Sequence, residues 1–410
     1  MNAPFRRRFH TPIFSRTGLL AIAIMVVLGS SALASADQPS SKDHLRATLV
    51  IDAEFGHPTS TSAQAIHLGA RLAVRDIERS GALDDVALTI RTSDNRGVSA
   101  IGVDNFLDAA KDPSVIAVMG GKLSPVQIEV TAVAHEQGLM LLDPWGAADG
   151  IIDNGFKPNW AFRLSMKDEW ASAAFVRAAL ADGVRNVGVI LPNSTWGRST
   201  QAALTTKARN AGVTIVGERW YNWGAASLAQ RYLDLVANGA QLVILVANEL
   251  EGALLAREVA ALPDDKRKPI LSHWGVTGGD LEQLAGEALY AIDFRIVQTF
   301  SFQRPGTPRA AALLSAVLAE TGKTSAREIE SPVGIAQGYD LTWLLAMAIH
   351  AAGSTDRAKV RDAMENLGPF EGAVRMYEKP FTRERHEALS EGDVFFARYE
   401  KGRGLAPLAP

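Results

Sequence analysis

The chain has 410 residues, 47% of them hydrophobic and 21% charged, which is enough apolar material for two or three globular domains. Its net charge of −3 argues against a nucleic-acid-binding protein, because such proteins normally carry a basic surface. Because the chain has no cysteine, disulfides, thiolate metal sites, cysteine nucleophiles and a lipidated N-terminal cysteine are all excluded.

The first 36 residues have the pattern of a secretory signal peptide. Four arginines within residues 6–16 precede an apolar run at 19–28, and small residues then offer cleavage after Ala34 or Ala36. Ten apolar residues are too few to cross about 30 Å of hydrocarbon, which disfavours a membrane anchor. Residues 37–410 carry 38 basic and 45 acidic side chains, so we expect a mildly acidic exported protein, in keeping with a bacterial periplasm.

Short apolar runs then alternate with amphipathic segments, as the strands and helices of an α/β protein do. Strands are expected at 47–51, 86–91, 115–119 and 139–142, with helices at 64–79, 100–111 and 126–137. The pattern restarts with strands at 187–191, 213–216, 242–246 and 270–272, and with helices at 200–210, 228–238 and 251–262. Two doubly wound lobes follow from this repetition, each a parallel sheet with helices on both faces.

The rest of the chain indicates how the two lobes are connected. Residues 289–296 are expected to lead back to the first lobe, followed by helices at 310–320, 333–352 and 356–367 and a strand at 393–397. The predicted organisation is a signal peptide at 1–36, the first lobe at 37–164, the second lobe at 165–294, a return to the first lobe at 295–353 and a C-terminal segment at 354–410 that crosses to the second lobe.

Enzyme motifs are missing from the sequence, which contains no G-x-S-x-G, H-E-x-x-H or G-x-G-x-x-G. The eight histidines are scattered, and no two of them lie four residues apart. His57, His135 and His273 could converge in space, but a structural role is the simpler interpretation of each. We therefore expect no enzyme, no metal and no cofactor, while a hydrolase that uses Asp or Glu stays open as an alternative.

The loops that follow the expected strands are the best candidates for a site, because open α/β sheets bind ligands at the carboxyl ends of their strands. Three of the eight tryptophans, Trp145, Trp196 and Trp274, fall in these loops. One loop tryptophan is best explained by core packing. Three at equivalent ends of two lobes favour a shared cleft, with core packing as the alternative.

Several segments together resemble type I periplasmic solute-binding proteins of the branched-chain amino-acid class, which serve ABC importers. The similarity runs from about Arg46 to Arg398, and its segments in order are 69–77, 118–124, 137–144, 161–163, 196–197 and 338–340. Each segment is weak alone, but their order and spacing are specific. The resemblance implies two Rossmann-like lobes joined by a three-strand hinge, a ligand enclosed by hinge closure, and a monomer that delivers it to ABC permease subunits in the inner membrane.

The resemblance also implies a set of ligand contacts. Ser124 matches the serine that holds the ligand carboxylate beside backbone amides, an arrangement suited to an anion. The next contact loop, usually small residues with a threonine, here holds Trp145, Gly146 and Ala147. Trp196 matches the aromatic side chain that packs on the ligand, and Asn248 stands at a usual tyrosine. The acidic residue that pairs with the ligand ammonium is replaced by Trp274.

This last departure argues against a standard α-amino acid as the ligand. Burying an ammonium without its carboxylate costs about 2–5 kcal/mol, or roughly 30- to 4,000-fold in affinity. Asp143, Glu249 and Asp280 could compensate, although none is at the matching position. Two ligand classes fit: an aromatic or short apolar organic acid, and a quaternary ammonium bound by tryptophan rings.

The sequence is also similar to the subgroup of this family linked to periplasmic PQQ-dependent alcohol oxidation. That resemblance implies an alcohol, an oxidation product or a related cofactor as the ligand. A periplasmic sensor of the same fold, docking on a membrane signalling partner, is the alternative to an importer component.

Overall fold

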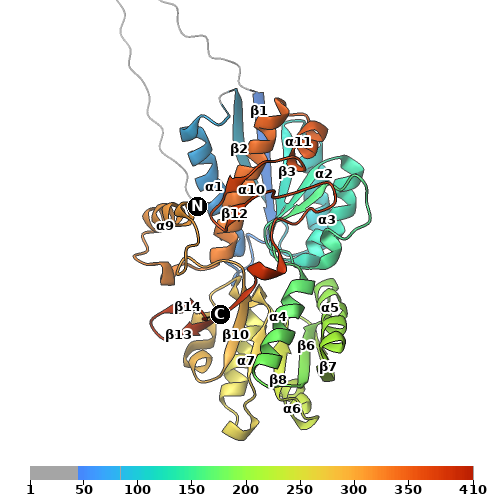
Figure 1. Cartoon of the computed structure of the whole chain (residues 1–410), viewed down its shortest axis with the longest axis vertical. Helices are drawn as coiled ribbons and strands as arrows, with labels where there is room; N and C mark the ends of the chain where they lie inside the picture. Colours follow the sequence, from blue (N-terminus) through green and yellow to red (C-terminus); the bar gives the residue numbers. More distant parts are fainter. Residues whose placement is uncertain (1–44, 84, 410) are drawn as a thin grey trace, which may run out of the picture. The chain divides into compact units, whose positions relative to one another are not determined.

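The computed structural model describes residues 45–83 and 85–409. The signal peptide expected at residues 1–36 lies outside these residues. Among the described helices, none is both long and apolar enough to span a lipid bilayer. The described residues form two α/β lobes, each built on its own large sheet (Figure 1).

The sheet of the first lobe has five parallel strands in the order β2-β1-β3-β4-β5. They are β1 (Leu45–Ala53), β2 (Val86–Asp94), β3 (Val115–Gly120), β4 (Met140–Asp143) and β5 (Ala161–Arg163). Alternate residues of β1 face different helix layers. Leu49 and Ile51 share a hydrophobic cluster with α1 (Ser62–Ser80) and α10 (Pro332–Ala352), whereas Val50 packs with α2 (Ser99–Ala110) and α3 (Ser124–Gln137).

Two glycines allow α1 and α10 to pack closely. A Cβ added at Gly69 would lie 2.0 Å from the carbonyl oxygen of Ile335, and one at Gly338 would lie 2.6 Å from that of Ile66. Backbone therefore meets backbone at both points, where any larger side chain would force the helices apart. This contact gives a physical reason for two of the segments that carry the family resemblance.

The second sheet has seven strands in the order β14-β13-β10-β9-β8-β6-β7. Its parallel part is β6 (Asn186–Pro192), β7 (Thr214–Tyr221), β8 (Leu242–Leu245), β9 (Ile270–Ser272) and β10 (Phe294–Gln298). β13 (Phe395–Glu400) and β14 (Gly404–Pro407) extend it in antiparallel fashion. One face of the sheet packs on α4 (Asp168–Ala181) and α5 (Thr195–Ala211), the other on α6 (Ala229–Ala237) and α7 (Glu249–Ala260).

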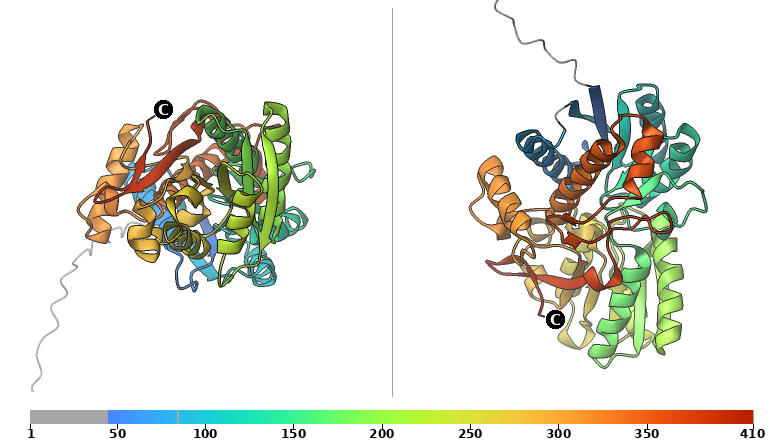
Figure 2. Two further views of the ribbon diagram at one scale, coloured as in Figure 1. Left: turned by 90° about the horizontal axis from the view of Figure 1, so that it is seen from below. Right: turned by 45° about the horizontal axis from the view of Figure 1, so that its top comes forward.

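The described chain passes between the two sheets three times. It leaves β5 for α4, returns after β10 to α9 (Pro308–Thr321) and α10, and leaves again after α11 (Arg357–Met364) for β13. Figure 2 shows the last of these passages in red. β10 continues past the division predicted at 294/295, because it pairs with β9 up to Ile296 and with β13 at Gln298. α11 packs on α10 of the first lobe.

Some elements differ from the sequence prediction. The helix α4 was not predicted, because it is alanine-rich and buries eight of its fourteen residues, so its polar and apolar faces do not alternate clearly. The strand expected at 393–397 is shifted to β13, and residues 289–290 belong to a short 3-10 helix (Gly286–Tyr290) that precedes β10. The short α8 (Leu281–Ala285) and the pair β11 (Phe370–Glu371) and β12 (Met376–Tyr377) were also not predicted.

Candidate functional site

The loops at the carboxyl ends of the strands in both sheets contact one another. Backbone amides of Thr61 and Ser62, at the start of α1, donate to the carbonyl oxygen of Gly278 in the second lobe. The Ser331 hydroxyl, before α10, donates to the carbonyl of Thr277 and bonds the Thr61 hydroxyl. The two lobes therefore meet through the edges where open α/β sheets bind ligands.

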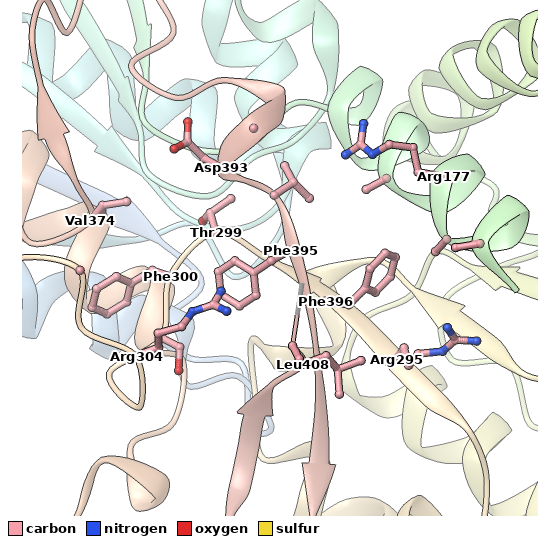
Figure 3. Close-up of a pocket in the computed structure, with 18 of the residues that line it drawn as sticks. Arg177, Arg295, Thr299, Phe300, Arg304, Val374, Asp393, Phe395, Phe396 and Leu408 are labelled. Atoms are coloured by element: carbon pink, nitrogen blue, oxygen red, sulfur yellow. The ribbon is translucent and has the colours of Figure 1, made fainter.

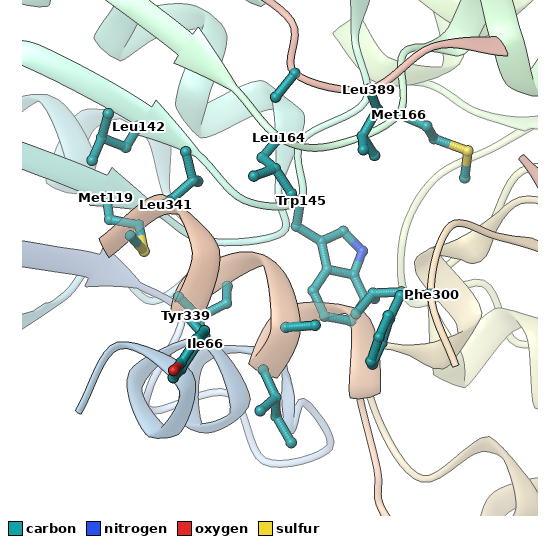
Figure 4. Packing of buried hydrophobic residues seen from close by; sticks show 14 of the residues in the cluster. Ile66, Met119, Leu142, Trp145, Leu164, Met166, Phe300, Tyr339, Leu341 and Leu389 are labelled. Carbon is teal, nitrogen blue, oxygen red and sulfur yellow. The ribbon is translucent and has the colours of Figure 1, made fainter. Parts of the chain in front are cut away.

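The three loop tryptophans lie at this junction and are buried, with exposed fractions of 1% for Trp145 and Trp274 and 5% for Trp196. The rings of Trp145 and Trp274 come from different lobes, and their centroids are 5.7 Å apart at an angle of 51°. Trp196 meets the ring of His273 edge-on at 5.0 Å. Figure 4 shows the Trp145 indole beside Phe300 and Met166. The three tryptophans belong to one hydrophobic core cluster, as the core-packing alternative expected. That they also line a ligand cleft stays a prediction.

The Trp145 indole nitrogen is a buried donor without an acceptor among the described residues. Its ring is held in place by close packing, since a Cβ at Gly334 would lie 2.7 Å from the indole. An unsatisfied buried donor typically costs about 1–3 kcal/mol. An acceptor oxygen beside this N–H would therefore be stabilised.

Ser124 is the first residue of α3, and its hydroxyl oxygen accepts from the backbone amides of Ala147 and Ala148 at 3.0 and 3.2 Å. The hydroxyl proton remains available to donate. The expected contact loop, including Gly146, is therefore tied to the start of α3 and held close to it. A Cβ at Gly146 would lie 2.8 Å from the Gln127 side chain and from Ile151, so only glycine fits there without rearrangement.

Asp143 holds the same loop in place through hydrogen bonds from the loop's backbone. One carboxylate oxygen accepts from the amides of Trp145 and Gly146 at 3.0 and 2.6 Å and from the Gln127 amide at 2.8 Å. Burial raises the pKa of Asp143 to about 7, although Arg163 and these hydrogen bonds lower it. One oxygen of the carboxyl group therefore holds the loop, while the other is buried without a hydrogen-bond partner among the described residues.

The second lobe holds its aromatic residues through Asp168, at the start of α4. One oxygen of Asp168 accepts from the Trp196 indole at 3.2 Å and the Thr200 hydroxyl at 2.9 Å, and lies 3.1 Å from Nε2 of His273. Nδ1 of His273 accepts from the backbone amide of Trp274. This assigns the ring proton to Nε2, which donates to Asp168. Sequence reasoning missed Asp168 because α4 itself was missed.

A buried ion pair also crosses the junction. Lys122 Nζ, in the loop after β3, lies 2.6 Å from a carboxylate oxygen of Glu249, the first residue of α7. The other oxygen of Glu249 accepts from the Thr59 hydroxyl at 3.0 Å, and His57 Nδ1 lies 3.9 Å from it. Lys122 also donates to the carbonyl of Gly278. Glu249 is thus engaged by three side chains of the first lobe.

Asn248 directly precedes Glu249, and its side chain packs against Gly275. A Cβ at Gly275 would lie 2.9 Å from the Asn248 side-chain oxygen and 2.6 Å from the Trp196 ring. Gly275 therefore lets Asn248, Trp196 and Trp274 come together. The seven predicted site residues lie in the segments that follow strands of the two sheets, either in the loops or in the first turn of the next helix: Ser124, Trp145, Gly146, Ala147, Trp196, Asn248 and Trp274.

The three histidines considered from sequence have different partners. His57 lies near Glu249, and His273 bonds Asp168. His135 bonds Thr131 and accepts from the Trp160 amide. Among the described residues, no group of three or more His, Asp or Glu side chains is arranged to hold a metal ion.

A family model described as periplasmic binding protein matches residues 55–403, so the chain belongs to that family, whose members are periplasmic solute binders and not enzymes. Leu/Ile/Val-binding protein homolog 1 of Brucella abortus is 24% identical over 324 residues, which cover 76% of this chain and 80% of that protein.

Two solved structures show the same fold. A periplasmic binding protein type 1 from Bordetella pertussis has a TM-score of 0.78 at 19% identity, covering 89% of this chain and 100% of that one. A solute-binding protein of an ABC transporter from R. palustris, in complex with benzoate, has a TM-score of 0.72 at 16% identity, covering 89% and 98%. The predicted fold, two Rossmann-like lobes of a type I periplasmic binding protein, is confirmed.

Proposed function

We propose that this protein is the solute-binding component of an ABC importer and that it encloses a small organic ligand between its lobes. The observation that carries the proposal is the junction itself, where strand-end loops of both sheets bury three tryptophans and an ion pair. The family match supports a solute-binding role, and the R. palustris neighbour of the same fold is named a solute-binding protein of an ABC transporter.

The mechanism follows from the three passages between the lobes. Small dihedral changes in these passages would part the loops and admit solute. A ligand that contacts both Trp145 and Trp274 stabilises the closed state, because only that state presents both rings. The permease would then recognise the closed form of the two lobes.

The ligand is proposed to lack a primary ammonium. Trp274 stands where the resemblance places an acidic residue, and each nearby carboxylate has another task. Glu249 is paired with Lys122, Asp143 holds the Trp145 loop, and Asp280 caps α8 by accepting from the amide of Gln283. An ammonium that paired with Glu249 would have to displace Lys122. Oδ2 of Asp143 is buried without a hydrogen-bond partner among the described residues, but burial raises the pKa of this carboxyl to about 7, so it offers an ammonium less negative charge than an ordinary carboxylate.

An aromatic or short apolar carboxylate fits the remaining groups best. Its oxygens would accept from the Trp145 indole N–H and the Ser124 hydroxyl, with Gly146 and Ala147 alongside. Its body would pack against Trp145, Trp196 and Trp274 near Asn248 once the Trp145 and Trp274 rings, which now touch, move apart. A quaternary ammonium offers no acceptor for the indole N–H. An alcohol offers one and is the second candidate. The fold accommodates such acids, since the R. palustris neighbour was solved with benzoate.

Native mass spectrometry of the exported protein from its own periplasm tests this function. We expect a discrete extra mass, lost after denaturation and refolding, that corresponds to an organic acid without a primary amine. An extra mass equal to leucine, isoleucine or valine would contradict the ligand class. The same spectra would report whether the protein is the expected monomer.

A sensor of the same fold is separated from an importer component by uptake. Deleting the gene should abolish high-affinity uptake of the identified ligand if the protein serves a permease. Unchanged uptake with loss of a ligand-induced transcriptional response would favour the sensor.

A further inference from the structure

A cavity lies next to the junction of the strand-end loops, and Phe300 belongs to its wall. It has a volume of about 700 Å³ and is formed by α4, the segment after β10 and the segment leading into β13 (Figure 3). Ligand pockets for small molecules commonly have volumes of roughly 300–1,000 Å³. None of the seven predicted site residues lines this cavity.

The cavity has an apolar wall. Ala174 and Ala178 of α4 face it from one side, and Phe300, Phe395 and Phe396 from the others. Figure 3 shows these three phenylalanine rings around the opening. Such a wall suits an aromatic or short alkyl group, whose burial is favourable by roughly 25 cal/mol for each Å².

The charged side chains around the cavity are paired, with one exception. Arg177 pairs with Glu391, Arg295 with Asp182, and Asp393 with Arg375. The guanidinium of Arg304 instead lies over the Phe395 ring, 4.4 Å from its centroid. Within residues 45–83 and 85–409, no carboxylate lies within ion-pair distance of Arg304.

The stacking on Phe395 places the Arg304 guanidinium at the cavity, where Figure 3 shows it between Phe300 and Phe395. A guanidinium binds a carboxylate through two parallel hydrogen bonds, and a planar cation on an aromatic ring loses less side-chain freedom on binding. The cavity thus combines an apolar wall with a single uncompensated positive charge.

We propose that this cavity is a second binding site, for an aryl or short-alkyl carboxylate. Arg304 holds the carboxylate, and Phe300, Phe395 and Phe396 surround the apolar part. The site is separate from the proposed cleft between the lobes and does not depend on what the cleft binds.

Isothermal titration calorimetry with 3-phenylpropionate tests the proposal on residues 37–410, which leave out the expected signal peptide. Apart from any event at the cleft, which Trp274→Ala would weaken, we expect a binding event that is weakened about tenfold or more in Arg304→Gln, which removes the charge at an exposed position. Ala178→Phe should abolish the same event by filling the cavity. Trp274→Ala, which alters only the cleft, should preserve it.

Two comparisons complete the test. Neutral 3-phenylpropan-1-ol should bind at least about tenfold more weakly at this site. Melting temperatures of both cavity variants establish that they fold. The proposal is overturned if wild type shows no event up to about 5 mM probe, or if folded Arg304→Gln and Ala178→Phe bind like wild type. Equal binding of the alcohol would overturn the assignment of an anionic ligand.

Discussion

Lys122 Nζ lies 2.6 Å from a carboxylate oxygen of Glu249, and this pair joins the loop after β3 in one lobe to the first turn of α7 in the other. The two side chains are 3% and 1% exposed. Parting of the lobes would hydrate both charges at once. The attraction between Lys122 and Glu249 therefore favours the closed arrangement of the lobes and is lost when the lobes separate.

Lys122→Met should shift the protein toward an open form. Removing one partner of a buried ion pair costs about 3–5 kcal/mol when the other charge stays buried, and opening the lobes relieves that cost by hydrating Glu249. Small-angle X-ray scattering should show a larger radius of gyration for the variant. Lys122→Met combined with Glu249→Gln should return it toward the wild-type value, whereas identical scattering from all three proteins would contradict this role.

Trp274→Ala should weaken binding of the cleft ligand by at least about 2 kcal/mol, or roughly 30-fold, because the ring packs across the junction on Trp145. Trp223→Ala is the matched control, since Trp223 is 41% exposed and lies outside the junction. Affinity and melting temperature are measured together. Unchanged affinity with a collapsed melting temperature would show that Trp274 acts only in the core.

Stability should fall as the pH rises from about 4 to about 7, partly through Asp143. Burial raises the folded-state pKa of this group to about 7, above its ordinary value of 3.8, so the folded protein binds the proton more tightly than the unfolded chain. The stabilisation is fully present below the unfolded pKa and is lost as the pH rises through the folded pKa. Urea unfolding measured across this range reports the slope.

Asp143→Asn should make that slope shallower. The asparagine oxygen can keep the three hydrogen bonds from Trp145, Gly146 and Gln127, while the group no longer titrates. A variant whose stability follows the wild-type pH dependence would assign the slope to other groups, such as Asp340, whose pKa is raised to about 6 by burial.

Gly275→Ala should destabilise the second lobe by about 1–3 kcal/mol, because its Cβ would lie 2.6 Å from both the Trp196 ring and the carbonyl oxygen of Ala247. Gly368→Ala is the control, since a Cβ there has no neighbour within 4 Å. Equal melting temperatures for the two variants would indicate that the Trp196 ring moves aside without cost.

Much of this fold could be predicted from sequence because strands and helices alternate with clear periods. Open α/β sheets bind ligands at the carboxyl ends of their strands, and this rule pointed to the segments that hold Ser124, Trp145, Trp196 and Trp274. It could not show that the rings of Trp145 and Trp274 contact each other, since that contact depends on how far the lobes are closed.

Two features of the site could not be predicted from the sequence around the residues involved. The pairing of Lys122 with Glu249 joins positions 127 residues apart, and neither residue is unusual in its own segment. Asp168 organises Trp196 and His273 from a helix that is buried on several sides and so lacks the amphipathic pattern. Such residues become visible only when the tertiary structure brings their partners together.

Calorimetry of the cleft with a matched ligand panel tests the central claim most directly. The panel contains benzoate and short-chain carboxylates, their alcohols, choline and the amino acids leucine, isoleucine and valine, each titrated into wild type, Trp274→Ala and Arg304→Gln. We predict that a carboxylate binds wild type and Arg304→Gln but is weakened by Trp274→Ala, while the amino acids give no binding. Tight binding of leucine, isoleucine or valine that depends on Trp274 would contradict the account.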